Sequence, residues 1–313
     1  MQGTIAITDY DWYELLRNQQ GLEETNFWKP SATRAFHANA FSPFIFKLKA
    51  PHNAICGFGF FARYSRLPVW LAWECFGIGN GCQSLADMRE RIGRIRDRIG
   101  YKGAAAAEIG CVLIVQPVFF PQEFWVRPPG NWPVRTQADK KYDLTVGEGA
   151  RVWDDCLRVA ADLMPAETPP PQLQTADSPG RRYGMPTFVV PRLGQGTFRV
   201  TVTEAYGRGC AVTDEHSLPA LEAAHIKSYV TGGPHDVRNG VLLRADLHRL
   251  FDQGYITLTS DLHLEVSRRL REDFANGRSY YPFHGKAIRC PTGVAEYPSN
   301  EYIRWHNEHI YLG

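Results

Sequence analysis

The chain has 313 residues, with 35 Lys and Arg against 33 Asp and Glu, and this length is more typical of two domains than of one. A hydrophobic content of 44% and an aromatic content of 12% exclude wholesale disorder. A net charge of +2 excludes a polybasic protein, although local clusters of charge can still bind nucleic acid. Because there is no membrane-length apolar run, no signal peptide and no paired pattern among the seven Cys, we expect a cytoplasmic protein without membrane contact.

The first 164 residues predict a mixed α and β domain. Ile5–Arg17 reads as a short strand followed by a helix that Asp11 caps. Ser84–Ile99 is the clearest helix, because Ser84 and Asp87 resemble a capping box and an apolar stripe follows. The other predicted elements are strands over Pro43–Lys49, Ala54–Tyr64 and Cys111–Val115 and a closing helix over Ala150–Met164.

A Pro-rich stretch over residues 165–186 predicts an extended linker, because consecutive prolines cannot continue a helix or join a central strand. The predicted domains are therefore residues 1–164 and 187–313. The second begins with a helix over Thr197–Tyr206 and ends with one near Glu301–His309. Between them we expect a strand–loop–strand–helix segment reaching Asp252, and then a hairpin of Tyr255–Leu258 and Leu262–Val266.

The strand–loop–strand–helix segment carries residues suited to phosphodiester hydrolysis. His248 and Asp252 lie four apart on the predicted helix, so they share one face and could hold a divalent cation with open positions left over. His225 ends the first strand, where a neutral imidazole could face the same cation and deprotonate a water. Asn239 could hold the loop through backbone hydrogen bonds. The intervening loop residue His235 is expected to be exposed.

The order of His225, Asn239 and His248 resembles the HNH endonucleases of the ββα-metal fold. The resemblance rests on the flanks Ala-Ala-His-Ile, Asn-Gly-Val-Leu-Leu and Leu-His-Arg-Leu-Phe-Asp-Gln-Gly and extends over nearly the whole C-terminal half. It implies that His225 is the general base, that Asn239 orders the loop and that the products carry 5′-phosphate and 3′-hydroxyl ends. It also implies that His248 and Asp252 bind the metal.

One position departs from the family pattern. Many HNH enzymes have an Asp or His ligand immediately before the base, where this chain has Ala224. Glu222 is the candidate for an additional ligand or for a supporting residue around the metal. Mg²⁺ or Mn²⁺ is the expected cofactor, with Ni²⁺, Co²⁺ or Zn²⁺ as alternatives, because a His/Asp pair does not select among them.

The N-terminal half resembles EVE/PUA-like β-barrel domains that read modified bases. The similarity rests on the segments Phe-Trp-Lys-Pro at 27–30, Pro-Phe-Ile-Phe-Lys-Leu-Lys at 43–49 and Ala-Ile-Cys-Gly-Phe-Gly-Phe-Phe at 54–61. It implies an aromatic cage around a flipped cytosine, although core packing is the alternative for each ring. The cage candidates are Trp28, Phe36, Phe60, Tyr64, Trp70 and Trp73, and the candidates for DNA backbone contact are Arg89, Arg94, Arg98, Arg268 and Arg269.

The sequence thus predicts an α+β protein with an EVE/PUA-like β-barrel and helices followed by a ββα-metal HNH domain. Its predicted function is that of a metal-dependent restriction endonuclease that cuts double-stranded DNA containing 5-methyl- or 5-hydroxymethylcytosine. A homodimer is expected if both strands are cut. The alternatives are a nuclease that reads an unmodified sequence, a backbone modification or RNA, and a non-catalytic nucleic-acid-binding protein.

Overall fold

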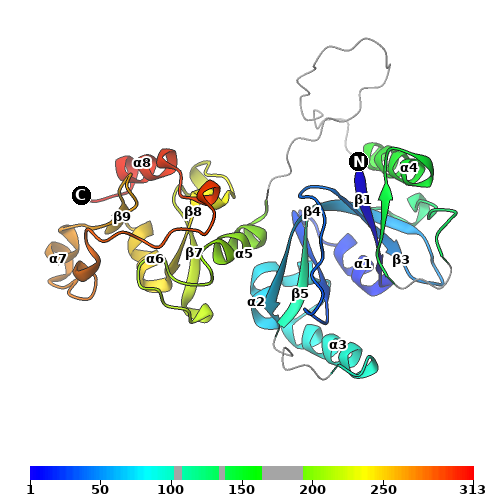
Figure 1. Ribbon diagram of the computed structural model, residues 1–313, viewed down its shortest axis with the longest axis horizontal. Helices are drawn as coiled ribbons and strands as arrows, with labels where there is room; N and C mark the ends of the chain where they lie inside the picture. Colours follow the sequence, from blue (N-terminus) through cyan, green and yellow to red (C-terminus); the bar gives the residue numbers. More distant parts are fainter. Residues whose placement is uncertain (102–107, 134–137, 164–192) are drawn as a thin grey trace, which may run out of the picture. The chain divides into compact units, whose positions relative to one another are not determined.

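A computed structural model of the protein describes residues 1–101, 108–133, 138–163 and 193–313. The chain divides into two compact units, residues 1–192 and 193–313 (Figure 1). The predicted linker over residues 165–186 lies outside the described residues. Both units combine helices with sheets, which confirms the predicted α+β class.

No helix in the described ranges combines the length and apolar character that crossing a membrane requires.

The first unit is built on a six-stranded mixed sheet in the order β2-β5-β4-β3-β1-β6, with β2 and β6 at its ends. β1 and β3 pair in parallel, and the other neighbours are antiparallel. β3 is buried along its whole length, as expected for an apolar run in the middle of a sheet. The strands are β1 (Gln2–Thr8), β2 (Glu24–Lys29), β3 (Pro43–Leu48), β4 (Ile55–Pro68), β5 (Glu108–Phe119) and β6 (Lys140–Asp143).

Among the described residues of this unit, four α-helices accompany the sheet: α1 (Tyr10–Arg17), α2 (Val69–Phe76), α3 (Leu85–Arg98) and α4 (Gly147–Leu163). The predicted cap of α1 is wrong by two residues, because Asp9 holds the cap position and Asp11 lies in the first turn. The cap of α3 is confirmed: the Asp87 amide donates to Ser84 Oγ at 3.1 Å. The Asp87 carboxylate reaches back to the amide of Gln83 rather than to that of Ser84.

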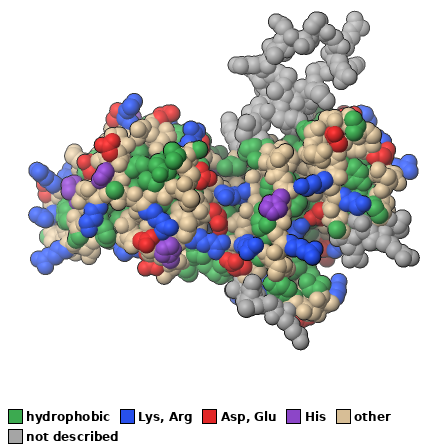
Figure 2. All heavy atoms as spheres, viewed as in Figure 1, with side chains coloured by type: hydrophobic (Ala, Val, Ile, Leu, Met, Phe, Trp, Pro, Cys, Tyr) green, Lys and Arg blue, Asp and Glu red, His purple; other side chains and the backbone are tan. Residues whose placement is uncertain are grey.

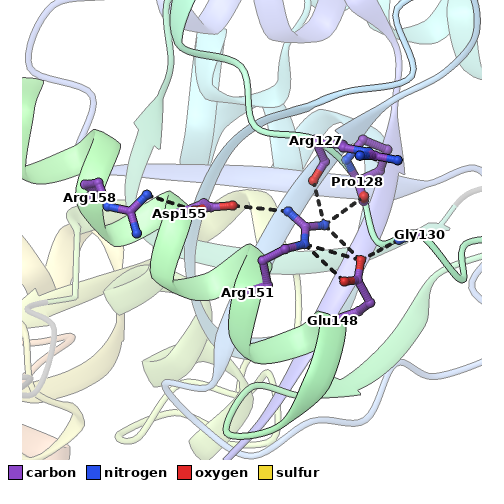
Figure 3. A network of polar contacts seen from close by, with 7 residues as sticks. All are labelled: Arg127, Pro128, Gly130, Glu148, Arg151, Asp155 and Arg158. Carbon is purple, nitrogen blue, oxygen red and sulfur yellow. Dashed lines mark hydrogen bonds and ion pairs between the residues drawn. The ribbon is translucent and has the colours of Figure 1, made fainter.

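One arginine fastens α4 to the loop before β6 (Figure 3). The Arg151 guanidinium donates to the carbonyl oxygens of Arg127 at 3.2 Å and Pro128 at 2.9 Å. It also bridges Glu148 and Asp155 on its own helix. A planar group with five N–H donors can make all these contacts at once, which a lysine cannot.

We therefore expect Arg151→Ala to lower the free energy of unfolding by about 1 to 2 kcal/mol, because two loop carbonyls lose their donor. Urea denaturation followed by tryptophan fluorescence would measure this. Arg158→Ala is the matched control, since Arg158 lies on the same helix, is 70% exposed and contacts Asp155 alone among the described residues, so no measurable change is expected. Equal effects of the two substitutions would contradict the assignment.

The second unit places a two-stranded hairpin among helices (Figure 1). Strands β7 (Leu221–His225) and β8 (Gly240–Arg244) pair antiparallel, and α6 (Ala245–Asp252) follows β8 directly. The predicted second hairpin forms between β9 (Ile256–Leu258) and β10 (Leu264–Val266). The remaining helices are α5 (Gln195–Ala205), α7 (Arg269–Phe274) and α8 (Asn300–His309). A core of buried side chains joins α5, the hairpin, α6 and the β9–β10 pair.

Candidate functional site

The hairpin and α6 bring the predicted catalytic residues into one region. β7 ends at His225, which pairs with Gly240 at the start of β8. α6 contacts both strands and carries His248 and Asp252. Its apolar side, with Leu247 and Phe251, is buried in the core, which orients the polar side.

The imidazole of His225 is held by ring contacts on two sides. It stacks on Phe198 of α5 with ring centroids 3.9 Å apart and planes 11° apart. Its Nε2 lies 3.0 Å from Nδ1 of His235 in the loop between the strands. Burial lowers the pKa of His225 to about 4, and the neighbouring His235 and His248 contribute to the same shift. The side chain is therefore neutral at physiological pH.

The prediction that His235 is exposed is wrong. The residue is half-buried, hydrogen-bonded to His225 and stacked on Tyr229 at a centroid distance of 4.3 Å. Phe198 is a second residue that sequence reasoning missed. Its contribution depends on α5 packing against the hairpin, although its segment belongs to the family resemblance.

A glycine permits the contact between α5 and His225. A Cβ atom at Gly240 would lie 2.4 Å from Val202 Cγ2 and 3.1 Å from the ring of Phe198. A side chain at this position would have to displace Val202 or Phe198 of α5. Packing against α5 therefore favours glycine at position 240, the strand partner of His225.

Asn239 closes the loop between the two strands. It is fully buried; its Oδ1 accepts from the Lys227 amide at 2.8 Å, and its Nδ2 donates to the Lys227 and Pro234 carbonyls, each at 2.9 Å. A Cβ at Gly233 would lie 1.9 Å from the Lys227 carbonyl oxygen, so the loop is tightly closed. This arrangement fixes the chain immediately after His225.

His248 lies between two carboxylates. Its Nδ1 is 2.7 Å from Glu222 Oε2 on β7, and its Nε2 is 3.3 Å from Asp252 Oδ2 one turn along α6. The pKa of the Asp252 carboxyl is raised, first by partial burial and then by the charge of Glu222, while His248 opposes the shift. The cluster concentrates negative charge that a cation would neutralise.

The donor set fits a divalent cation with several open positions. If neutral His248 donates its Nδ1–H to Glu222, Nε2 keeps the lone pair that a metal needs, and Glu222 acts as the supporting carboxylate. Two ligands at right angles, each about 2.1 Å from a metal, lie about 3 Å apart. The 3.3 Å between Nε2 and Asp252 Oδ2 is close to that separation.

No group of three or more His, Cys, Asp or Glu residues within the described ranges has an arrangement that could hold a metal ion. Ala224, at the position where the family often has a ligand, is fully buried in the core. The two ligand candidates therefore suit a cation that keeps several waters or substrate oxygens, as Mg²⁺ does.

His306, to which the sequence assigned no role, packs against α6 through Phe251. It is buried, stacks on Phe251 at 3.9 Å and donates from Nε2 to the Phe251 carbonyl at 3.0 Å. Burial lowers the pKa of His306 to about 4, so it is neutral and keeps an acceptor at Nδ1, 2.8 Å from the Thr257 hydroxyl. It thus satisfies a carbonyl near the end of the helix that carries His248 and Asp252.

Two of the predicted cage residues of the first unit, Phe36 and Phe60, pack on different sides of the sheet. Phe60 is buried and packs against Trp153 of α4, whereas Phe36 packs against Phe44 and Phe61. Neighbouring residues on a strand point to opposite faces, so Phe60 and Phe61 serve different sides of the sheet. The other four candidates, Trp28, Tyr64, Trp70 and Trp73, are half-buried, and a cage built from them stays a prediction.

The five arginines predicted to contact DNA are all exposed. On α3, Arg94 pairs with Glu90 at 3.6 Å, and on α7, Arg269 pairs with Asp273 at 3.3 Å. Acidic and basic side chains are interspersed over the face of each unit shown in Figure 2. Mixed charge of this kind gives modest affinity for a phosphate backbone.

Residues 210–259 match the family model described as HNH endonuclease, so the second unit contains an HNH endonuclease domain. The match spans β7, the closed loop, β8 and α6, which are the elements that hold His225, Asn239, His248 and Asp252. No curated protein is similar enough to match the chain.

The solved structures that show a weak likeness to the chain include the following two. ASCH from Zymomonas mobilis is 11% identical with a TM-score of 0.33, and the match covers 49% of this chain and 94% of that one. The modification-dependent TagI restriction endonuclease is 12% identical with a TM-score of 0.28, covering 97% of this chain and 81% of that one. Likeness of this degree fixes neither activity nor substrate.

Proposed function

We propose that the protein is a metal-dependent DNA endonuclease that hydrolyses phosphodiester bonds at the His225 site. One observation carries the proposal: within a segment matching the HNH endonuclease model, a neutral, half-buried imidazole ends β7, and the adjoining helix presents His248 Nε2 and Asp252 Oδ2 3.3 Å apart. A base and a two-ligand cation site are what hydrolysis of an unactivated phosphodiester needs.

In this mechanism His225 accepts a proton from a water molecule as its oxygen attacks phosphorus. The bond from phosphorus to the 3′ oxygen breaks, and that oxygen takes a proton from solvent, which yields 5′-phosphate and 3′-hydroxyl ends. A divalent cation held by His248 and Asp252 would neutralise charge on the phosphate and stabilise the leaving oxygen. Glu222 orients His248, and Asn239 holds the strand end on which His225 lies.

For the first unit we propose that it selects the DNA, with modified cytosine as its target. This part rests on the sequence resemblance of the unit to base-reading domains. The partial exposure of Trp28, Phe36, Tyr64, Trp70 and Trp73 leaves aromatic surface for a base. One such site cuts one strand, so a double-strand break would require two copies of the chain.

The test is a nicking assay on three matched supercoiled plasmids, unmodified, 5-methylcytosine-containing and 5-hydroxymethylcytosine-containing, with Mg²⁺ or Mn²⁺ and with EDTA. We expect nicking of modified plasmid that EDTA abolishes, and a rate at least ~100-fold lower for His248→Ala. Arg289→Ala, a surface change in the same unit, is the control and should keep activity. Equal cutting of all three plasmids would overturn the modified-cytosine target alone, and EDTA-resistant cutting would overturn the metal dependence.

A further inference from the structure

Four aromatic rings from three segments contact one another in series, and one of them is His225, the proposed base. Tyr229 stacks on His235, His235 Nδ1 lies 3.0 Å from His225 Nε2, and His225 stacks on Phe198. The proposed function uses His225 alone. The direct contact between two imidazole nitrogens raises the question of which one carries the proton.

The role of His225 as a base determines which of the two nitrogens, His225 Nε2 or His235 Nδ1, carries the hydrogen. A neutral imidazole has one N–H and one lone pair, and only the lone pair can take a proton from water. Among the described residues, His225 Nδ1 has no hydrogen-bond partner, whereas Nε2 faces His235. If Nδ1 is the basic atom, Nε2 carries hydrogen and donates it, so Nδ1 of His235 must be the acceptor.

We propose that His235 is the positioning residue of the general base: it accepts a hydrogen bond from His225 Nε2–H and thereby leaves His225 Nδ1 as the basic atom. This inference rests on the proposed function. When His225 Nδ1 takes the proton from water, the resulting imidazolium still donates from Nε2 to His235. The acceptor thus keeps the ring in one orientation and in one tautomer, with the lone pair of Nδ1 available to the water.

If His235 only filled space, its substitutions would affect nicking in the opposite order from the order expected if it positions His225. The His235 ring also fills space, with its centroid 4.3 Å from Tyr229 and 5.6 Å from Phe198. Phe at this position keeps an aromatic ring but has no acceptor. Asn loses the ring but places its side-chain oxygen where the Nδ1 atom of His lies. The two variants therefore separate the effect of losing the hydrogen-bond acceptor from the effect of losing the ring.

The experiment measures kcat and KM for nicking by wild type, His235→Phe and His235→Asn, with His225→Ala as the inactive reference. We expect His235→Phe to lower kcat by ~10- to 100-fold at nearly unchanged KM and His235→Asn to stay within ~5-fold of wild type. The reverse order, with Phe active and Asn impaired, would overturn the proposal in favour of packing.

A second measurement needs neither metal nor DNA. ¹⁵N NMR of the histidine side chains at pH 7 should show His225 as the Nε2–H tautomer in wild type and His235→Asn, and as a mixture in His235→Phe. A Nδ1–H tautomer in wild type would overturn the proposal. If no plasmid is nicked by wild type, the proposed function fails, and the tautomers still decide whether His235 orients His225.

Discussion

Replacing His225 with Ala is expected to lower the nicking rate by about 10²- to 10⁴-fold, because the variant loses the group that takes the proton from water. Metal binding should change little, since His248 and Asp252 hold their positions through α6 and Glu222. A kcat effect with an unchanged metal requirement is therefore the expected signature in single-turnover plasmid nicking.

The matched control is His263→Ala. His263 lies in the same unit, in the loop between β9 and β10, and its ring forms a hydrogen bond with the Asp261 carbonyl. Its loss should leave nicking unchanged. Circular dichroism would establish that both variants are folded. Metal-dependent nicking by His225→Ala at the wild-type rate would show that the assigned base is wrong.

The pH dependence of the same reaction follows from the environment of His225. A histidine in water is half protonated at pH 6.5, whereas burial and the neighbouring His235 and His248 lower the pKa of His225 to about 4. The neutral, basic form therefore persists as the pH falls from 7 to 5. With metal saturating at each pH, so that metal binding does not limit the rate, wild-type nicking should show no loss with an apparent pKa near 6.5. Such a loss would contradict a neutral, half-buried base.

Elements set by local spacing could be predicted from the sequence. α6 follows from its apolar positions, and the cap of α3 follows from Ser84 and Asp87, because both depend on residues within one or two turns. The β7–β8 hairpin could be predicted for the same reason, since two apolar runs flank a Gly- and Pro-containing loop.

Contacts between distant segments could not be predicted in this way. The stack of Phe198 on His225 joins residues 27 positions apart and requires Gly240 to bring α5 close. His235 lies only ten residues from His225, but its direction depends on how tightly Asn239 closes the loop. The side on which each ring of the predicted cage packs could not be predicted either, because composition does not say which sheet face a ring occupies. Phe60 and Phe61, for example, face different sides.

Asn239 closes the loop that follows His225, so its substitution should lower the stability of the second unit. Asn239→Ala removes three hydrogen bonds and leaves the Lys227 amide and the Lys227 and Pro234 carbonyls without their partner. We expect the free energy of unfolding of the second unit to fall by about 2 to 4 kcal/mol, because unsatisfied groups in a buried loop lose solvation as well as the bond. Urea denaturation would measure the loss.

Asn239→Asp separates hydrogen bonding from side-chain volume. The carboxylate keeps an acceptor for the Lys227 amide but places oxygen against the Lys227 and Pro234 carbonyls, where Nδ2 now donates. It should therefore destabilise the unit at least as much as Ala does, although it preserves the shape. Asn276→Ala, at an exposed position of the same unit, should have no measurable effect. If Asn239→Asp were as stable as wild type, the side chain would be filling space rather than closing the loop. His225 would then owe its orientation to Phe198 and His235 alone.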